Sequence, residues 1–160
     1  MIETGFNNIQ VQLMMQGNSA NLNRNLVSKY HEAQNKAWFA GLVARLLGRS
    51  NAILSLEAAL SGKPAAASHY AGLRSVPVDA IHGSEARGDD FDRSFNPLSG
   101  RTMARWLSVA RARLMGVPLP PVELIEVNGA YFVRDGHHRI SVARSLGERY
   151  IEADVIVVTC

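Results

Sequence analysis

The residues best suited to chemistry lie together in one short segment of the chain. Asp135 and Gly136 are followed at once by His137, His138 and Arg139. A carboxylate can hold a magnesium ion or accept a proton, imidazoles transfer protons near neutral pH, and a guanidinium binds phosphate through two parallel hydrogen bonds. Glycine lets the backbone turn sharply and approach a ligand closely. This segment is therefore the first candidate for a functional site.

The residues before this candidate site predict a helix and then a β-hairpin. Apolar residues at helical spacing predict the helix over 101–115. Residues 122–127 alternate with strand period, and residues 131–134 are mostly aromatic or β-branched. Asn128 and Gly129 join the two runs, and Asn-Gly between such runs is the strongest short-range hairpin signal. The candidate site thus begins where the second strand ends.

The residues after the site predict a helix and a final strand. Apolar residues recur at helical spacing from Gly136 onward, Gly147 provides a C-cap, and residues 150–158 form a strand-like run. A helix N-terminus has free N–H groups and a partial positive charge, which suit an anion. The order of strand, glycine and helix therefore predicts a phosphate-binding turn. The alternative is that Asp135 is simply a helix cap and the histidine pair a solvated helix start.

The pattern over residues 129–147, Gly-x-Tyr-Phe-Val-x-Asp-Gly-His-His-Arg-x-x-x-Ala-x-x-Leu-Gly, resembles the ParB/sulfiredoxin superfamily. The resemblance extends over residues 73–158, and residues 76–81 look like the opening strand of that fold. It implies an α+β protein with a small mixed-sheet core, here with an N-terminal helical extension. It also implies that a Gly-x-x-Arg turn at a helix start binds the phosphates of a nucleotide, ATP or CTP, with Mg²⁺ as the accompanying ion.

The chain departs from both named branches of this superfamily. Gly136, His138 and Arg139 match the glycine, histidine and arginine of the sulfiredoxin Gly-Cys-His-Arg signature, but His137 stands at the position of the reactive cysteine. Sulfiredoxin activity is therefore not expected, and Cys160 lies far from the motif in sequence. Partition proteins have Gly-Glu-Arg-Arg at this turn and recognise DNA through further domains. Weak or no sequence-specific DNA binding is expected here.

A second polar segment follows the predicted opening strand. Superfamily members often turn this segment toward the nucleotide, which implies phosphate contacts for Ser84 and Arg87. It also implies that Glu85 holds the metal or accepts a proton. Three carboxylates farther along are candidates for a magnesium site: Asp89, Asp90 and Asp92. The alternative is a polar surface loop held down by its aromatic residues.

The predicted roles fall into three groups. The candidate catalytic residues are Asp135, His137 and Glu85, the candidate phosphate-binding residues are Gly136, His138, Arg139, Ser84 and Arg87, and the candidate metal ligand is Asp135. These roles suit a nucleotide-binding protein that hydrolyses the nucleotide or transfers its phosphoryl group to a small molecule. The alternatives are a non-catalytic regulatory or nucleic-acid-binding module of the same fold, and a metal-dependent nuclease that uses the histidine pair.

The N-terminal part of the chain predicts helices outside this core. Residues 1–22, rich in Asn and Gln, are expected to be a flexible lead-in, and residues 23–72 a helical extension and linker. Within the extension, apolar spacing predicts one helix over 23–48 and another over 50–62. This pair is a candidate substrate cap, a contact for a homodimer, or packing for the core. Residues 73–160 form the predicted nucleotide-binding domain.

Composition and charge set outer limits on the function. The chain has 160 residues, of which 47% are hydrophobic, enough for one ordinary core. A net charge of +3, with scattered basic residues, favours a solvated helix face over a nucleic-acid-binding tail. A single cysteine excludes an internal disulfide and suits a reducing compartment. Neither a secretory signal nor a membrane-spanning run is visible, so a cytoplasmic protein without membrane contact is expected.

Overall fold

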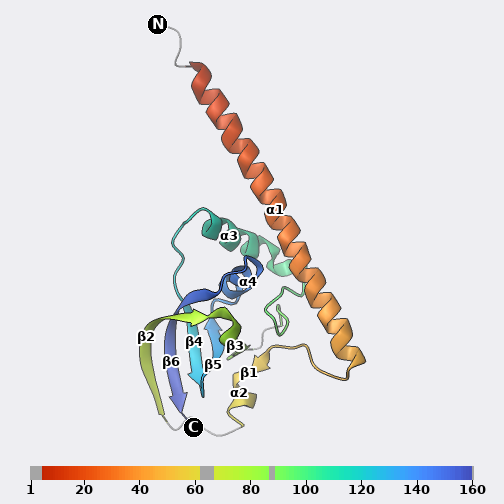
Figure 1. Ribbon diagram of the computed structural model, residues 1–160, viewed down its shortest axis with the longest axis vertical. Helices are drawn as coiled ribbons and strands as arrows, with labels where there is room; N and C mark the ends of the chain where they lie inside the picture. The colour runs from red at the N-terminus through yellow and green to blue at the C-terminus, as the bar shows by residue number, and fades with distance from the viewer. Residues whose placement is uncertain (1–4, 62–66, 87–88, 160) are drawn as a thin grey trace.

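The computed structural model describes residues 5–61, 67–86 and 89–159, and the side chains within these ranges from Gly17 onward. The helices are α1 (Gly5–Leu46), α2 (Leu56–Ala59), α3 (Met103–Leu114) and α4 (His137–Ser145) (Figure 1). The strands are β1 (Leu54–Ser55), β2 (Ala67–Pro77), β3 (Ile81–Ser84), β4 (Val122–Val127), β5 (Ala130–Asp135) and β6 (Tyr150–Thr159). Short 3₁₀ turns at Val78–Ala80 and Gly100–Thr102 precede β3 and α3.

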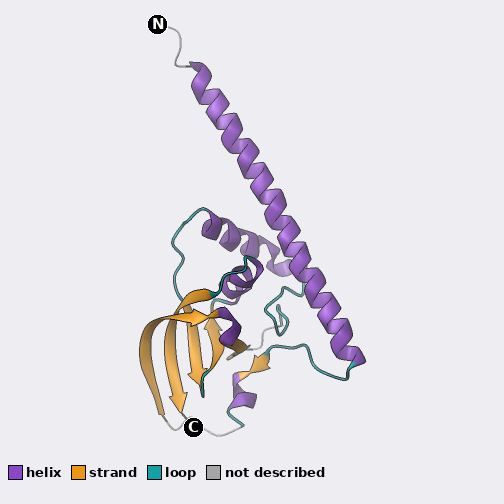
Figure 2. Ribbon diagram, in the orientation of Figure 1, coloured by secondary structure: helices purple, strands orange, loops and turns teal. Residues whose placement is uncertain are grey.

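The strands form one six-stranded sheet in the order β1-β3-β5-β4-β6-β2 (Figure 2). It is mixed, because β4 pairs with β5 and β2 with β6 in antiparallel fashion, whereas the pairs β1–β3, β3–β5 and β4–β6 are parallel. The predicted α+β fold, a mixed sheet with a helical extension at the N-terminus, is confirmed.

The predicted hairpin and the helix that follows it are also confirmed. Asn128 and Gly129 both have positive φ, 51° and 81°, as the two-residue turn between antiparallel β4 and β5 requires. The helix α4 begins immediately after Gly136 and ends before Gly147, which has φ of 74°. The expected helix over 101–115 is α3. Local sequence signals therefore determine the elements that carry the candidate site.

The helix α4 lies between the sheet and the other long helices. Its Ile140 and Ala143 pack into the core formed by the strands, while Val142 belongs to a second cluster that α1 and α3 share. In that cluster Trp106 of α3 is fully buried and meets the ring of Tyr30 of α1 edge-on, with ring centroids 5.4 Å apart. Its Nε1 also donates a hydrogen bond of 3.0 Å to the hydroxyl of Ser141 on α4. Trp106 thus connects three helices.

The helix α1 starts much earlier than the sequence predicts. Residues 5–22, expected to be a flexible lead-in, belong to α1, and residues 1–4 lie outside the described part of the chain. The stretch has no proline, and its Gln, Leu, Met and Ala residues all suit a helix. The predicted end near Gly48 is confirmed, since α1 stops at Leu46 and Gly48 has φ of 64°.

The region after α1 differs most from expectation. The predicted helix over 50–62 is reduced to the short β1 and the single turn α2, and the predicted linker after it contains the start of β2. Residues 62–66 lie outside the described ranges. The single strand predicted over 76–81 is wrong in its middle, because the end of β2 and the start of β3 are separated by the 3₁₀ turn Val78–Ala80. Pairing with the long, β-branched β6 forces residues 67–75 into a strand despite their small, polar side chains.

The C-terminal end of α1 carries exposed apolar side chains. Trp38 is 70% exposed and Leu46 80% exposed, and Leu42 and Val43 are also exposed. The homodimer contact expected through the N-terminal helices stays a prediction, and these residues are where it would be sought. No helix in the described part of the chain has the length and apolar character that a bilayer crossing requires.

Candidate functional site

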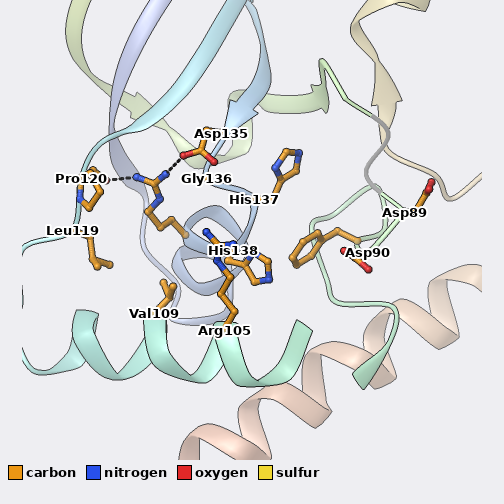
Figure 3. Close-up of a pocket in the computed structure, with 12 residues that line it drawn as sticks. Asp89, Asp90, Arg105, Val109, Leu119, Pro120, Asp135, Gly136, His137 and His138 are labelled. Atoms are coloured by element: carbon orange, nitrogen blue, oxygen red, sulfur yellow. Dashed lines mark hydrogen bonds and ion pairs between the residues drawn. The ribbon is translucent and has the colours of Figure 1, made fainter. Parts of the chain in front are cut away.

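A pocket of about 500 Å³ lies at the N-terminal end of α4 (Figure 3). Its walls come from the end of β5 and start of α4, one side of α3, the segment before β4, and the loop after β3. The lining residues are Asp89, Asp90, Phe91, Arg105, Val109, Leu119, Pro120, Asp135, Gly136, His137, His138 and Arg139. All five residues of the segment 135–139 are among them, so the structure brings the predicted motif into a pocket.

Gly136 is the residue that gives this junction its shape. Its backbone is left-handed, with φ of 109° and ψ of 20°, and it is the N-cap of α4. A Cβ at this position would lie 2.6 Å from Cγ1 and 2.9 Å from Cβ of Val122, closer than real side chains approach. Glycine is therefore required both for the turn and for the close contact with β4.

The N-terminal turn of α4 has free backbone donors. The first hydrogen bond of the helix runs from the N–H of Ile140 to the carbonyl of Gly136, at 3.0 Å. The N–H groups of residues 137–139 therefore have no acceptor within the helix. Gly136 has no side chain to cap them, and no side-chain cap is found. The helix presents these donors and its partial positive charge beside the pocket.

Arg139 is largely occupied by the protein itself. Its Nη1 donates to the carbonyls of Pro120 and Pro121, at 2.5 and 2.7 Å, and its Nη2 donates to Asp135 at 2.5 Å. Its side chain is 13% exposed. Three of the five guanidinium N–H groups are thus used, which leaves the Nε–H and one Nη2–H for a ligand. Arg139, which the sequence predicts to bind phosphate, therefore also holds the segment before β4 that forms one wall of the pocket.

Asp135 is paired rather than free. Its carboxylate accepts the hydrogen bond from Arg139, one helical turn ahead, and is 62% exposed. Within the described ranges, no three His, Cys, Asp or Glu side chains lie close enough together to hold a metal ion. The metal role that the sequence assigns to Asp135 therefore has no supporting ligand cluster in this part of the chain.

The two histidines are packed against Phe91. The ring of His137 stacks on it with centroids 6.3 Å apart, and the ring of His138 meets it edge-on at 5.1 Å. Burial lowers the pKa of His137, and the nearby carboxylates of Asp135 and Asp90 oppose this effect. Burial also lowers the pKa of His138, with a further contribution from Arg105. Both rings are therefore neutral at neutral pH and able to accept a proton.

These lowered pKa values predict an acid-sensitive fold. Below the ordinary histidine pKa of 6.5, His137 and His138 bind protons in the unfolded chain but remain unprotonated in the folded state until the pH reaches their lowered pKa values. Stability is therefore expected to be fully present above pH 6.5 and to fall as the pH drops through the lowered pKa values. Urea unfolding from pH 7.5 to pH 5 measures this slope.

The variant His137→Gln should show a shallower decline in stability below pH 6.5 than the wild type. Above pH 7 the stabilities of both proteins should be independent of the state of this ring, which provides the internal control. An unchanged slope in the variant would contradict the link to His137.

Two residues predicted from the segment after the opening strand, Ser84 and Glu85, are not among the residues that line the pocket. Ser84 is fully buried, and its hydroxyl lies 2.8 Å from Nε2 of His137. Glu85 accepts two hydrogen bonds from Arg134, at 2.8 and 3.2 Å, and this pairing holds the pKa of Glu85 below its usual range. Arg87 lies outside the described residues. The structure thus brings Ser84 to the motif but pairs Glu85 elsewhere.

The three carboxylates of the following loop have separate roles. Asp89 and Asp90 line the pocket, and Asp90 also pairs with Arg101 at 2.8 Å. Asp92 is fully buried and accepts hydrogen bonds from the backbone N–H groups of Ser94 and Asn96, at 2.9 and 2.8 Å. Such bonds organise a turn. Asp92 is therefore a structural residue, and its expected part in a magnesium site is not supported.

Sequence reasoning missed the part of the pocket that α3 contributes. Arg105 and Val109, one turn apart, line the pocket, whereas Trp106 and Ala110 on the other side of α3 are buried toward α1. The i, i+4 spacing of Arg105 and Val109 places them on one face. The sequence therefore shows that these two residues share a face of α3. It does not show that this face meets the pocket, because that depends on how α3 packs.

The fold and the pocket together define an α+β protein with a helix N-terminus at a polar pocket. Among solved structures the chain is similar to sulfiredoxin from Arabidopsis thaliana, with 19% sequence identity and a TM-score of 0.41. The match covers 54% of this chain and 86% of that chain. No protein-family model matches the chain, and no curated protein matches it. The similarity concerns the fold alone.

Proposed function

We propose that the pocket at the start of α4 binds the phosphates of a nucleotide, ATP or CTP. The observation that carries this proposal is the set of N–H groups of residues 137–139, which have no acceptor within the helix and lie beside the pocket. A helix N-terminus of this kind binds phosphate through direct hydrogen bonds and through its partial positive charge. The Nε–H and remaining Nη2–H of Arg139 add two donors at the same place.

The remaining walls of the pocket suit the other parts of a nucleotide. The volume of about 500 Å³ falls within the range of small-molecule sites. Leu119 and Pro120 lie on one side of the pocket and Asp89 and Asp90 on the opposite side (Figure 3). The apolar side would contact the base or the sugar, and the acidic side would approach the cation that accompanies the phosphates.

Magnesium fits the acidic wall better than it fits Asp135. Mg²⁺ is usually held by one or two protein carboxylates together with substrate phosphates and water, so a three-residue cluster is not needed. Asp89 and Asp90 supply two neighbouring carboxylates on the pocket wall, although Asp90 also pairs with Arg101. Asp135 is a single carboxylate and is paired with Arg139. We therefore expect nucleotide binding to strengthen when Mg²⁺ is added.

Arg105 is the side chain whose removal tests the proposal most cleanly. It lines the pocket from α3, and no carboxylate partner is found for it in the described part of the chain. The variant Arg105→Gln is expected to bind ATP or CTP about tenfold more weakly, the effect of losing one charge-assisted hydrogen bond at an accessible site. Isothermal titration calorimetry with each nucleotide, with and without Mg²⁺, measures this change.

The matched control is Arg93→Gln, which removes the same charge from an exposed position that does not line the pocket. It should bind as the wild type does. The proposal fails if the wild type binds neither nucleotide, or if both variants lose affinity equally. Release of inorganic phosphate in the same samples distinguishes a nucleotide hydrolase from a non-catalytic binding module.

A further inference from the structure

Ser84 and His137 form a contact that the proposed phosphate site does not explain. Ser84 is the last residue of β3 and His137 the first of α4, and Oγ of Ser84 lies 2.8 Å from Nε2 of His137. The same hydroxyl donates to the carbonyl of Val133 at 3.2 Å. The contact therefore connects a buried strand end to a side chain that lines the pocket.

The form of the imidazole follows from the direction in which the single hydroxyl hydrogen of Ser84 points. A serine hydroxyl has one hydrogen, and a carbonyl oxygen can only accept. If the hydroxyl of Ser84 donates to Val133, Nε2 of His137 must carry the hydrogen of the 2.8 Å bond and donate it to Ser84. The neutral ring then has no hydrogen on Nδ1, which is left as the proton acceptor.

Burial distinguishes a positioning role for Ser84 from a nucleophilic one. A serine in hydrogen-bond contact with a histidine is also the arrangement of an activated nucleophile. Ser84, however, has no exposed surface, so a ligand in the pocket cannot reach its hydroxyl. The preceding Gly83 is packed so tightly that an added Cβ would lie 2.5 Å from both the carbonyl of Leu54 and the ring of Phe132. The strand end is therefore held firmly.

We propose that Ser84 is a positioning residue that holds the ring of His137 in its Nε2–H form and leaves Nδ1 as the proton-accepting atom of this pocket side chain. The hydrogen-bond assignment rests on the contacts alone. The use of Nδ1 as a base toward a bound nucleotide or its attacking group rests on the proposed function.

Nuclear magnetic resonance of protein labelled with ¹⁵N at histidine tests this assignment directly. At pH 7.5 the wild-type His137, assigned by comparison with His137→Gln, should show a hydrogen on Nε2 and none on Nδ1. In Ser84→Ala this hydrogen should exchange with water about tenfold faster, because the bond that retains it is lost.

The matched control is Ser141→Ala, which removes another buried hydroxyl on the same helix, one that is hydrogen-bonded to Trp106 and not to His137. It should leave the His137 signals unchanged. A wild-type spectrum with the hydrogen on Nδ1 would overturn the proposal, and this measurement needs no variant to fold. Unchanged exchange in folded Ser84→Ala would also overturn it. Failure of nucleotide binding would leave these signals as they are, so the two proposals fail separately.

Discussion

The variant Gly136→Ala is expected to lose nucleotide binding and to lower the free energy of unfolding by about 2–5 kcal/mol. Part of this cost is the strain of alanine at φ of 109°. The rest comes from a Cβ placed 2.6 Å from Cγ1 of Val122, which would push the start of α4 away from β4. Urea unfolding followed by circular dichroism gives the stability, and calorimetry gives the binding.

Gly147→Ala at the other end of α4 separates strain from contact. Gly147 has φ of 74°, and nothing lies within 4 Å of an added Cβ, so this variant carries the strain alone. It should cost about 1–2 kcal/mol and keep nucleotide binding. Equal destabilisation by the two variants would show that the contact with Val122 is not limiting, and normal binding by Gly136→Ala would contradict the role of the turn.

The variant Trp106→Ala is expected to cost about 3–5 kcal/mol, the range for truncating a large buried aromatic side chain. The ring is fully buried, contacts Tyr30, and donates to Ser141. Its loss should weaken the attachment of α1 to α3 more than it affects the sheet. Relative to the wild type, hydrogen exchange should therefore show a larger loss of amide protection in α1 at residues 22–33 than in β4–β6.

Trp106→Phe provides the graded control, because it keeps an aromatic ring and removes the Nε1 donor. It should cost about 1–3 kcal/mol, largely by leaving the buried hydroxyl of Ser141 without its partner. If Trp106→Ala lowered protection equally in the sheet and in α1, the tryptophan would be part of one undivided core and not a connection between helices.

The elements that carry the motif could be predicted because each depends on neighbouring residues. Asn128 and Gly129 determine the turn of the hairpin, and Gly136 and Gly147 limit α4 through their own backbone conformations. The strand β2 could not be predicted in the same way. Its small and polar residues become a strand through pairing with β6, whose residues lie about 80 positions later.

The sequence identifies pocket residues that are neighbours in the chain, but not those that tertiary packing brings in from a distant element. The residues of the continuous segment 135–139 line one pocket, but Arg105 comes to it through the packing of α3. The sequence also could not show which carboxylates of the loop face the pocket and which are buried. Asp92 and Asp90 are close neighbours in the chain, yet Asp92 is buried in a turn while Asp90 faces the pocket. Which residue of a polar run is exposed depends on tertiary contacts.

The bonds from Arg139 to the carbonyls of Pro120 and Pro121 connect the start of α4 to the segment that leads into β4. Prolines have no N–H, so this segment has few donors of its own with which to attach itself to the sheet. A phosphate that drew the guanidinium toward itself would lengthen the bonds of 2.5 and 2.7 Å and loosen the entry to β4. The position of the Leu119–Pro120 wall would then report whether the pocket is filled, which makes this proline segment a natural place for a spectroscopic label.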